Sequence, residues 1–510
     1  MNRPVGFSVL LFLAVFLLVV SSVKPAFSSD SSTVPNGYLN AVYEEWEISD
    51  DETMGVVGLG VHHNFSDCFS LGVGSWMAVK GERGGFITLG VDGNLCLPIT
   101  ERIAFESGVF IGAGGGRGGY TLSGGGLMLR PHAQLTYDTG SFGKLSAGVS
   151  YVRFPNGGSI ESTQPYISFS LPFYAYMENG WTDGHSESTA QKRERGSRSN
   201  SLAAVVRDLH AASGAETVNG VAQRDFTLLG IEWRSYFNDS WYAKLETEGA
   251  AGGNSRGYMQ ILVGGGAEIP VAGNLFVNAD ASVGGGGGGN VDTGGGLLLD
   301  ASAGIGYYLA SGLFAGLSGA YITAPDGTFE ATSLALKLGY RSGGSPANND
   351  NGISRFSEKP SNMRLRLVHQ IYYKASDLWR THQADMNVEN IGIQIDGFLD
   401  RNWYLTGQGL AAYGGDAGAY MTGLLGLGVR KNIVGKAFVN AEGLVGAAGG
   451  GGLATGGGLV WQGNVGLGYD LHPSLSALAT VGRIDAFDGD FKADVFGFSL
   501  AYNFNSFLLH

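Results

Sequence analysis

The sequence predicts an all-β protein, a transmembrane antiparallel β-barrel made of three tandem eight-stranded repeats. Three observations lead to this prediction: an internal repeat, long segments of alternating hydrophobicity, and a composition with few charges. Charged residues are 15% of the 510 positions, aromatic residues are 11%, and glycine occupies 86. So few charges argue against a disordered chain, and the glycines lack the period of three that marks collagen. One wide barrel of about 24 strands is the alternative arrangement.

Three short motifs carry the internal repeat. The run Gly-Gly-Gly-Leu begins at Gly124, Gly294 and Gly456, with spacings of 170 and 162 residues. The same two spacings separate the turns Asn156-Gly157, Asp326-Gly327 and Asp488-Gly489. A third motif begins at Phe65, Phe237 and Phe398 and ends each time in an aspartate two residues on. A fixed period marks one folding unit used several times, and each unit is long enough to be a whole domain.

The N-terminal segment predicts export. Arg3 supplies a positive start, residues 7–20 are apolar, and Ala26-Phe27-Ser28 has the small-x-small form of a cleavage site. A single membrane anchor is the alternative, but the apolar run is short for a bilayer-spanning helix. The expected organisation is a signal peptide at 1–28, barrel repeats at 36–177, 201–341 and 363–510, and polar linkers at 178–200 and 342–362.

Alternating residues divide the predicted strands into two faces. In residues 68–80 one alternate set is mostly apolar and includes Phe69, whereas the other is mostly small or polar and includes Ser70. This period of two over about ten residues is typical of a barrel strand, although a soluble β-sandwich also alternates. Phe69, Trp241 and Trp403 follow equivalent turns and suit a membrane–water girdle. In repeat two the eight strands are expected to centre near Ala203, Leu229, Leu245, Leu262, Val277, Ala303, Leu317 and Leu336.

The choice between three narrow barrels and one wide barrel depends on the inward face. A wide barrel has an aqueous lumen lined by charged side chains, whereas an eight-stranded barrel has a narrow, filled interior. The inward face is expected to be rich in Gly, Ala and Ser, and the runs 284–289 and 449–452 suit tight bends and close backbone approach. Long linkers also favour separate units. The sequence therefore favours three barrels.

The end of each repeat resembles the lipid A deacylase family, eight-stranded outer-membrane barrels related to PagL. The resemblance rests on a Gly-Gly-Gly-apolar strand, a penultimate strand ending in an Asn-Gly loop, and a final strand, here residues 151–173. It implies the barrel architecture. The family's His-x-Ser-Asn motif falls on 153–156, 323–326 and 485–488, where the His and Ser are missing, and Glu161 or Glu330 could match its acidic residue. A serine hydrolase needs its nucleophile beside a base, so no enzyme is expected.

Other chemical signals are weak, and no catalytic, cofactor or metal site is expected. His62 and His63 are neighbours on one strand and should point to opposite faces. Asp485, Asp488 and Asp490 could hold Ca²⁺ but suit a solvated turn better. An acidic hairpin tip is expected at Glu44, Glu45, Glu47, Asp50, Asp51 and Glu52, either solvated or bridged to lipopolysaccharide by divalent cations.

The leading functional hypothesis is a non-enzymatic protein of the cell outer membrane of a Gram-negative bacterium, with a structural, adhesive or envelope-organising role. Porin-like transport through one wide barrel is the alternative, and a lipid-modifying enzyme is a third hypothesis. The expected partners are outer-membrane lipid and lipopolysaccharide, and the barrel-assembly machinery, because the last strand resembles its recognition signal. The net charge of −13 argues against nucleic acid.

The two cysteines, Cys68 and Cys96, are predicted to form a disulfide. They begin and end one predicted hairpin centred on Glu82, so antiparallel pairing places them directly opposite each other. Both belong to the inward-facing set, and the exported compartment is oxidising. Two free thiols are the alternative. Repeats two and three lack cysteine, so the bond would add only local stability.

Overall fold

A computed structural model describes residues 36–49, 52–116, 126–140, 142–156, 158–173, 177–181, 199–310, 312–341, 361–375 and 387–506. The predicted signal peptide and most of both predicted linkers lie outside these residues. In the described part of the chain, every long regular element is a β-strand. Within it, no helix has the length and apolarity needed to cross a bilayer.

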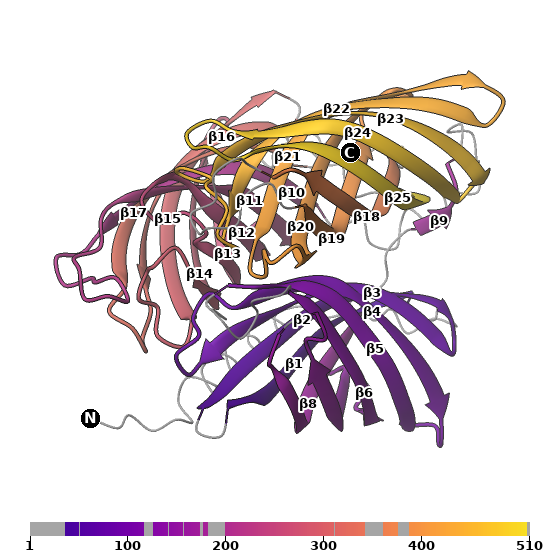
Figure 1. Ribbon diagram of the computed structural model, residues 1–510, viewed down its shortest axis with the longest axis horizontal. Helices are drawn as coiled ribbons and strands as arrows, with labels where there is room; N and C mark the ends of the chain where they lie inside the picture. Colours follow the sequence, from indigo (N-terminus) through magenta and orange to yellow (C-terminus); the bar gives the residue numbers. More distant parts are fainter. Residues whose placement is uncertain are drawn as a thin grey trace.

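The strands form three separate closed barrels of eight antiparallel strands each (Figure 1). Barrel 1 contains β1 (Gly37–Ser49), β2 (Glu52–Ser66), β3 (Phe69–Lys80), β4 (Ile87–Pro98), β5 (Ile103–Gly115), β6 (Leu127–Asp138), β7 (Lys144–Arg153) and β8 (Glu161–Phe173). Barrel 2 contains β10 (Asn200–Ala211), β11 (Phe226–Tyr236), β12 (Trp241–Gly253), β13 (Met259–Ala272), β14 (Leu275–Gly287), β15 (Leu297–Ala310), β16 (Leu313–Thr323) and β17 (Glu330–Arg341). Each of the eight expected strand centres in repeat two lies within one of these strands.

Barrel 3 contains β18 (Ser361–Tyr373), β19 (Val388–Phe398), β20 (Trp403–Gly414), β21 (Met421–Val434), β22 (Ala437–Gly449), β23 (Leu459–His472), β24 (Leu475–Ala486) and β25 (Lys492–Ser506). The first strand of every barrel pairs with the last strand of the same barrel, as β1 with β8, β10 with β17 and β18 with β25. The chain therefore does not form one barrel of about 24 strands. A short strand, β9 (Met177–Asn179), pairs with the end of β25.

The two faces of the strands separate as the alternation predicts. Exposed apolar side chains cover the outer surfaces of all three barrels, including Leu95, Leu135, Val149 and Ile167 in barrel 1, Val206, Ile305 and Leu336 in barrel 2, and Leu427, Val465 and Phe498 in barrel 3. Phe69, Trp241 and Trp403 are 39%, 59% and 52% exposed. An outward apolar band with aromatic residues near its edge is the pattern of a barrel that faces lipid.

Each barrel has two different ends. The terminus end holds the beginning of the first strand, the end of the eighth strand and three short turns. In two of these turns Asn238 and Asp400 accept hydrogen bonds from the backbone N–H groups that follow, at 2.7–2.9 Å. The loop end holds the other four connections and is closed inside by a cluster of three aromatic rings. These clusters are Trp46, Phe86 and Phe154 in barrel 1, Phe226, Tyr258 and Phe329 in barrel 2, and Tyr372, Tyr420 and Phe491 in barrel 3.

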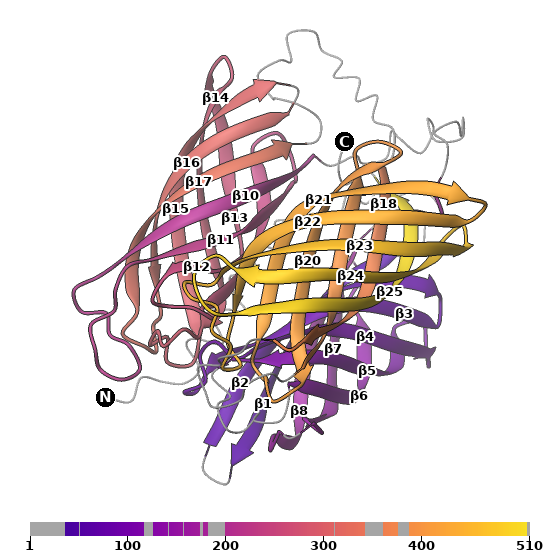
Figure 2. The same ribbon diagram turned by 45° about the horizontal axis from the view of Figure 1, so that its top comes forward.

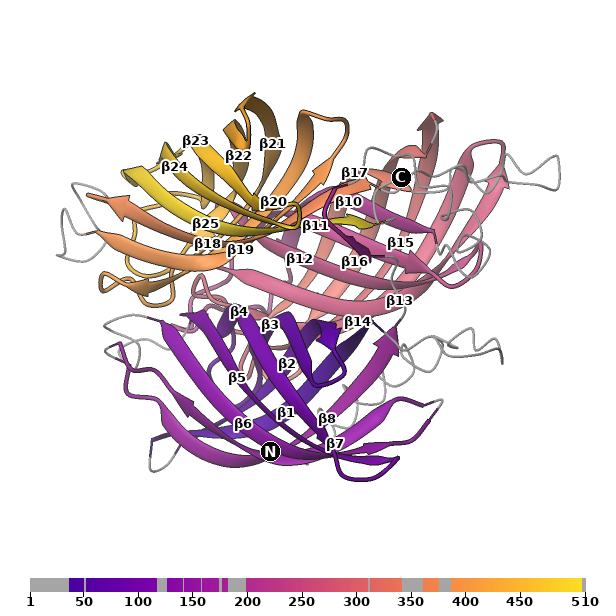
Figure 3. The same ribbon diagram turned by 90° about the vertical axis from the view of Figure 1, so that its right-hand side faces the viewer.

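The three barrels touch one another near their loop ends and are inclined to one another, as Figures 2 and 3 show. The third strand of one barrel approaches the fifth strand of the next in every case. The contacts are β3 with β14, β12 with β22, and β20 with β5. Barrel 1 thus contacts barrel 2, barrel 2 contacts barrel 3, and barrel 3 contacts barrel 1, which closes a ring.

Candidate functional site

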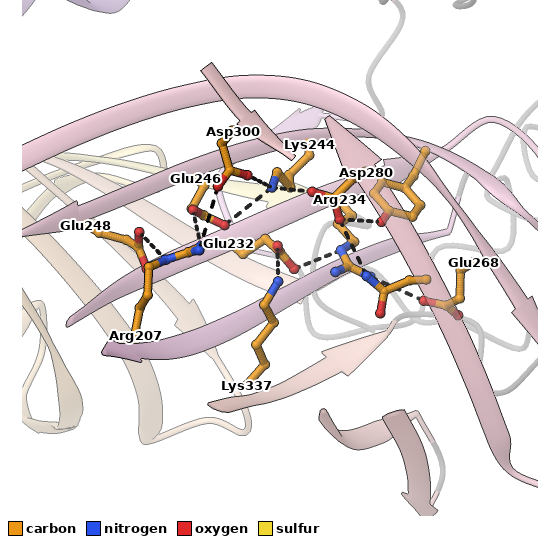
Figure 4. Close-up of polar contacts among 12 residues, drawn as sticks. Arg207, Glu232, Arg234, Lys244, Glu246, Glu248, Glu268, Asp280, Asp300 and Lys337 are labelled. Atoms are coloured by element: carbon orange, nitrogen blue, oxygen red, sulfur yellow. Dashed lines mark hydrogen bonds and ion pairs between the residues drawn. The ribbon is translucent and has the colours of Figure 1, made fainter. Parts of the chain in front are cut away.

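The lumen of barrel 2 is filled by a buried network of charged side chains (Figure 4). Arg207 lies between two carboxylates, 2.6 Å from Glu246 and 2.9 Å from Glu248. Lys244 lies 2.5 Å from Asp280 and 3.6 Å from Glu246. All five side chains are at most 7% exposed. Charges buried to this degree need close partners, and here most partners come from strands that are not neighbours in the sheet, such as β10 and β12.

The same network continues toward the terminus end of barrel 2. Glu232 lies 2.8 Å from Arg234 and 2.7 Å from Lys337. Glu268 lies 2.7 Å from Arg341 and 3.4 Å from Arg234. The inward face of barrel 2 thus contains small residues, such as Ser282, Ser302 and Ala335, but it also carries charged side chains that the prediction of Gly, Ala and Ser left out. The prediction was extended from residues 68–80, whereas Lys244, Glu246 and Glu248 already alternate with other residues in the printed sequence.

Barrels 1 and 3 are also crossed by polar side chains. In barrel 1, Glu44 accepts hydrogen bonds from Arg130 at 2.9 Å and from the Ser150 hydroxyl at 2.7 Å. In barrel 3, Asp396 pairs with Arg364 at 2.6 Å and with Arg366 at 2.9 Å. Glu44 thus lies in the lumen and not at the expected acidic hairpin tip, because its position on β1 points inward.

One crossing pair occupies the same register in all three barrels but has different chemistry in each. The pair is Glu44 with Arg130 in barrel 1, Arg207 with Asp300 in barrel 2 and Gln370 with Gln462 in barrel 3. The equivalence follows from strand pairing, since Glu44, Arg207 and Gln370 lie opposite Val56, Leu228 and Asn390. The separations are 2.9 Å for the first ion pair, 3.9 Å for the reversed ion pair and 3.2 Å for the neutral amides. Complementarity across the lumen is kept while the charges change.

The terminus ends of barrels 2 and 3 are closed in different ways. In barrel 2 the Arg341 guanidinium stacks 3.6 Å from the Tyr236 ring and donates a hydrogen bond to the Tyr308 hydroxyl. In barrel 3 the closing side chain is Trp181, which comes from the segment after barrel 1. Its indole N–H donates to the Met363 carbonyl at 2.9 Å, and Arg430 lies 4.4 Å from its ring.

The Gly-Gly-Gly-Leu motif forms the contact between barrels. A Cβ at Gly296, the third glycine, would lie 2.6 Å from the Ala78 carbonyl oxygen of barrel 1. Gly458 faces Ala250 of barrel 2 in the same way, and Gly126 donates a hydrogen bond to the Ala412 carbonyl of barrel 3 at 3.2 Å. The first glycine packs against the barrel's own Asp-Gly turn, as Gly294 does against Asp326. The glycine motif and the Asp-Gly turn of the same barrel therefore touch each other, and the glycine motif also contacts the neighbouring barrel.

Apolar side chains fill the centre of the ring. They belong to the outward-facing sets but are buried or partly buried, because another barrel covers them. Ile87, Met259 and Met421 occupy equivalent positions at the start of the fourth strand of each barrel, and all three belong to one cluster with Met77 and Leu297. We call this set the central cluster. It supplies apolar packing to a contact whose polar part is backbone hydrogen bonding.

The predicted hairpin register of the two cysteines is confirmed. The Cys96 N–H donates to the Cys68 carbonyl at 2.9 Å, so the residues lie directly opposite each other at the terminus end of barrel 1. Both are free thiols in the structure. The disulfide therefore stays a prediction.

The structure separates the other residues that the sequence singled out. His62 points into the lumen and stacks on Tyr38 with ring centroids 4.5 Å apart, whereas His63 points outward and contacts Phe65. Within the described residues, no group of three or more His, Cys, Asp or Glu side chains is placed to hold a metal ion. Asp485 lies 3.6 Å from Arg483, while Asp50 and Asp51 lie outside the described residues.

The residues that match the deacylase motif lie at the loop end. Arg153 ends β7 and lies 3.9 Å from Glu161, with both side chains exposed. The Asn156 amide donates a hydrogen bond to the Tyr413 carbonyl of barrel 3. Of these residues, Asn156 therefore contributes to the ring, and Arg153 and Glu161 form an exposed ion pair without a nucleophile beside a base.

No protein-family model and no curated protein sequence matches the chain. Solved structures that match it include Pseudomonas aeruginosa OpdQ, with 10% identity and a TM-score of 0.22 over 92% of this chain and 95% of that chain. The P. aeruginosa ferric enterobactin receptor PfeA matches with 11% identity and a TM-score of 0.28 over 93% and 82%. The siderophore receptor PirA from Acinetobacter baumannii matches with 10% identity and a TM-score of 0.27 over 93% and 81%. Scores this low carry no argument about fold or function, both of which rest here on the chain's own geometry.

Proposed function

We propose that the chain is a non-enzymatic outer-membrane protein in which three sealed barrels form a single-chain ring with a structural, envelope-organising role. The observation that carries this proposal is the ring itself. The same glycine motif makes the contact in all three barrels, so the contact is a repeated part of the folding unit. Membrane insertion is supported by the apolar outer surfaces and by the predicted export signal.

The filled lumens favour a structural role over transport. Water and ions need a continuous polar path through a barrel, and a narrow eight-stranded barrel leaves little room for one. Buried ion pairs cross barrels 2 and 3, and aromatic clusters close the loop end of each barrel. Opening such a path would separate buried charges from their partners, which costs several kcal/mol for each ion.

Planar-bilayer recording on the purified full chain tests the absence of transport. Sealed barrels are expected to give a flat current without unitary steps at moderate voltage. Stable, stepwise conductance in salt would support the porin hypothesis and overturn the sealed-lumen proposal. A preparation of an established porin in the same bilayer provides the control for insertion.

Cell fractionation tests the location. The mature chain is expected in the outer-membrane fraction and should resist carbonate extraction, because its outer surfaces are apolar. Recovery of the folded chain as a soluble periplasmic protein would contradict membrane insertion. Lipid and lipopolysaccharide are the partners that these outer surfaces would meet, and the last strand, β25, is the segment proposed to engage the assembly machinery.

A further inference from the structure

Barrels 1 and 3 touch at two separate places along their facing sides. Near the loop ends, a Cβ at Gly409 of β20 would lie 2.9 Å from Leu89 Cδ2 of β4. At the terminus ends, Phe65 at the end of β2 lies beside Tyr502 of β25, with ring centroids 5.7 Å apart. Between these places β3 and β4 of barrel 1 face β18 and β19 of barrel 3, as Figures 1 and 3 show.

On barrel 1 the two contacts are joined along the outward face of β3. Leu89 pairs with Ser75 of β3, and the outward residues that follow toward the terminus end are Val73 and Leu71. Met77, on the same face of β3, is 0% exposed because it belongs to the central cluster. Leu71 is 40% exposed and Val73 is half-buried, so the cover that a neighbouring barrel gives to β3 ends before the terminus end.

On barrel 3 the two contacts are joined by a row of paired residues that runs across four strands. Gly409 pairs with Ile393, Ile393 with Leu367, and Leu367 with Leu500, which lies two residues before Tyr502. Leu367 and Leu500 are 42% and 44% exposed, and Ile393 is half-buried. Barrels 1 and 3 therefore touch at both ends of this line but do not close on each other between them.

The surface between the two contacts is apolar on both sides. We call it the seam, and it consists of Val73 and Leu71 of barrel 1 and Ile393, Leu367 and Leu500 of barrel 3. Water in the seam would meet only apolar side chains inside the bilayer, which is unfavourable. An empty gap would lose dispersion contacts on both sides. Hydrocarbon satisfies both requirements, and the seam is continuous with the outer surfaces that face lipid.

The position of the seam indicates which lipid supplies the hydrocarbon. The seam lies on the terminus side of the ring contact, and the terminus ends carry the short turns of the barrels. In outer-membrane barrels short turns face the periplasm. The periplasmic leaflet consists of glycerophospholipids, whereas lipopolysaccharide belongs to the opposite leaflet.

We propose that the seam between barrels 1 and 3 holds an acyl chain of a glycerophospholipid from the periplasmic leaflet, an assignment that rests on the membrane location proposed above. This lipid contacts protein on two sides, whereas a lipid beside a single barrel contacts it on one. The larger apolar contact makes it leave the protein more slowly than the surrounding lipid. The bound lipid thus completes the contact between barrels 1 and 3.

Native mass spectrometry of the full chain tests this site. The chain is extracted from outer membranes and washed with detergent, and the wild type is expected to keep a phospholipid. Leu71→Trp and Leu367→Trp each place a larger ring in the seam and should lower the retained phospholipid by about tenfold. Leu336→Trp is the matched control, because Leu336 is 60% exposed on the outer surface of barrel 2 and lies outside the seam. Heat-modifiable migration on gels verifies that each variant is folded.

A photoactivatable phospholipid gives a second measurement without any substitution. The wild-type chain is loaded with a phospholipid that carries a diazirine in its acyl chain, washed with detergent and irradiated. Peptides from β3, β18 and β19 are expected to carry the label, whereas peptides from β17 should not. This measurement locates the lipid that the mass of the complex only counts.

Four results would overturn the proposal. They are a washed wild-type chain without phospholipid, equal retention in the two seam variants and in Leu336→Trp, label spread evenly over the three barrels, and retention of lipopolysaccharide in place of phospholipid. All samples come from the outer-membrane fraction, so each of these results concerns the seam. A failure of the membrane location itself would appear earlier, as absence of the chain from that fraction.

Discussion

At the loop ends the three barrels use equivalent residues for equivalent contacts, whereas inside the lumens equivalent positions hold different chemistry. Ala78, Ala250 and Ala412 each face a glycine of the neighbouring barrel. The crossing pair of the lumen, in contrast, is Glu–Arg in barrel 1, Arg–Asp in barrel 2 and Gln–Gln in barrel 3. A ring contact depends on backbone approach, which permits few side chains. A lumen needs only matched partners, and several combinations satisfy that requirement.

The largest expected effect comes from breaking one lumen pair. Arg130→Gln leaves the Glu44 carboxylate buried without its cation, which should destabilise barrel 1 by about 3–5 kcal/mol. The double variant Glu44→Gln/Arg130→Gln copies the amide pair of barrel 3 and should recover most of that loss. Unfolding midpoints in urea, followed by heat-modifiable migration, measure both. If the double variant is no more stable than the single one, the lumens are not interchangeable in the way proposed.

A second variant tests the ring instead of the lumen. Gly458 has φ +101° and faces the Ala250 carbonyl, so Gly458→Val meets both backbone strain, on the order of 1–3 kcal/mol, and a clash. We expect each barrel to fold while the contact between barrels 2 and 3 loosens. Protease cleavage within 342–360 should then leave barrel 3 attached only to barrel 1, so that it dissociates at a lower urea concentration than in the cleaved wild-type chain. Gly443→Val is the matched control, because nothing lies within 4 Å of a Cβ there.

These two variants also separate what the sequence predicts from what it does not. The number of strands and their faces follow from period-two alternation and from the repeat. The preference for three barrels over one wide barrel comes from the small inward residues and the long linkers. The ring cannot be predicted in this way. The third glycine of each motif is needed because a residue of another repeat lies against it, as Ala78 lies against Gly296. Glycine alone is equally compatible with a tight bend and with a close backbone approach.

The lumen networks were missed for a different reason. Inward positions are visible in the sequence, and the alternation of Lys244, Glu246 and Glu248 was a usable signal for barrel 2. Partners across a barrel come from strands far apart in the chain, as Glu44 and Arg130 do. Their pairing becomes evident only when the register is known. Trp181 gave no signal at all, since it lies in a predicted linker and its partners belong to barrel 3.

A smaller effect is expected when Trp181 is replaced. Trp181→Ala removes one hydrogen bond and one stacked cation, together worth about 1–2 kcal/mol. Barrel 3 should keep its fold, while the segment after barrel 1 detaches from the mouth. Faster proteolysis within 174–198, with barrel 3 unchanged on gels, is the expected result. Unchanged proteolysis would show that β9 alone holds the segment.

The smallest effect is expected from the cysteine pair. Mass spectrometry of the non-reduced protein should find Cys68 and Cys96 joined, because they lie directly opposite each other and the exported compartment is oxidising. Reduction should change only barrel 1 and should leave the ring intact. Two alkylatable thiols in freshly purified protein would refute the bond.

Projection electron microscopy of the purified chain in lipid nanodiscs tests the central claim most directly. The account predicts three small, filled densities that meet around a common centre, with no stain-filled pore inside any of them. Gly458→Val should disturb that arrangement, and Gly443→Val should preserve it. One large ring around a single stained pore would contradict the three-barrel ring.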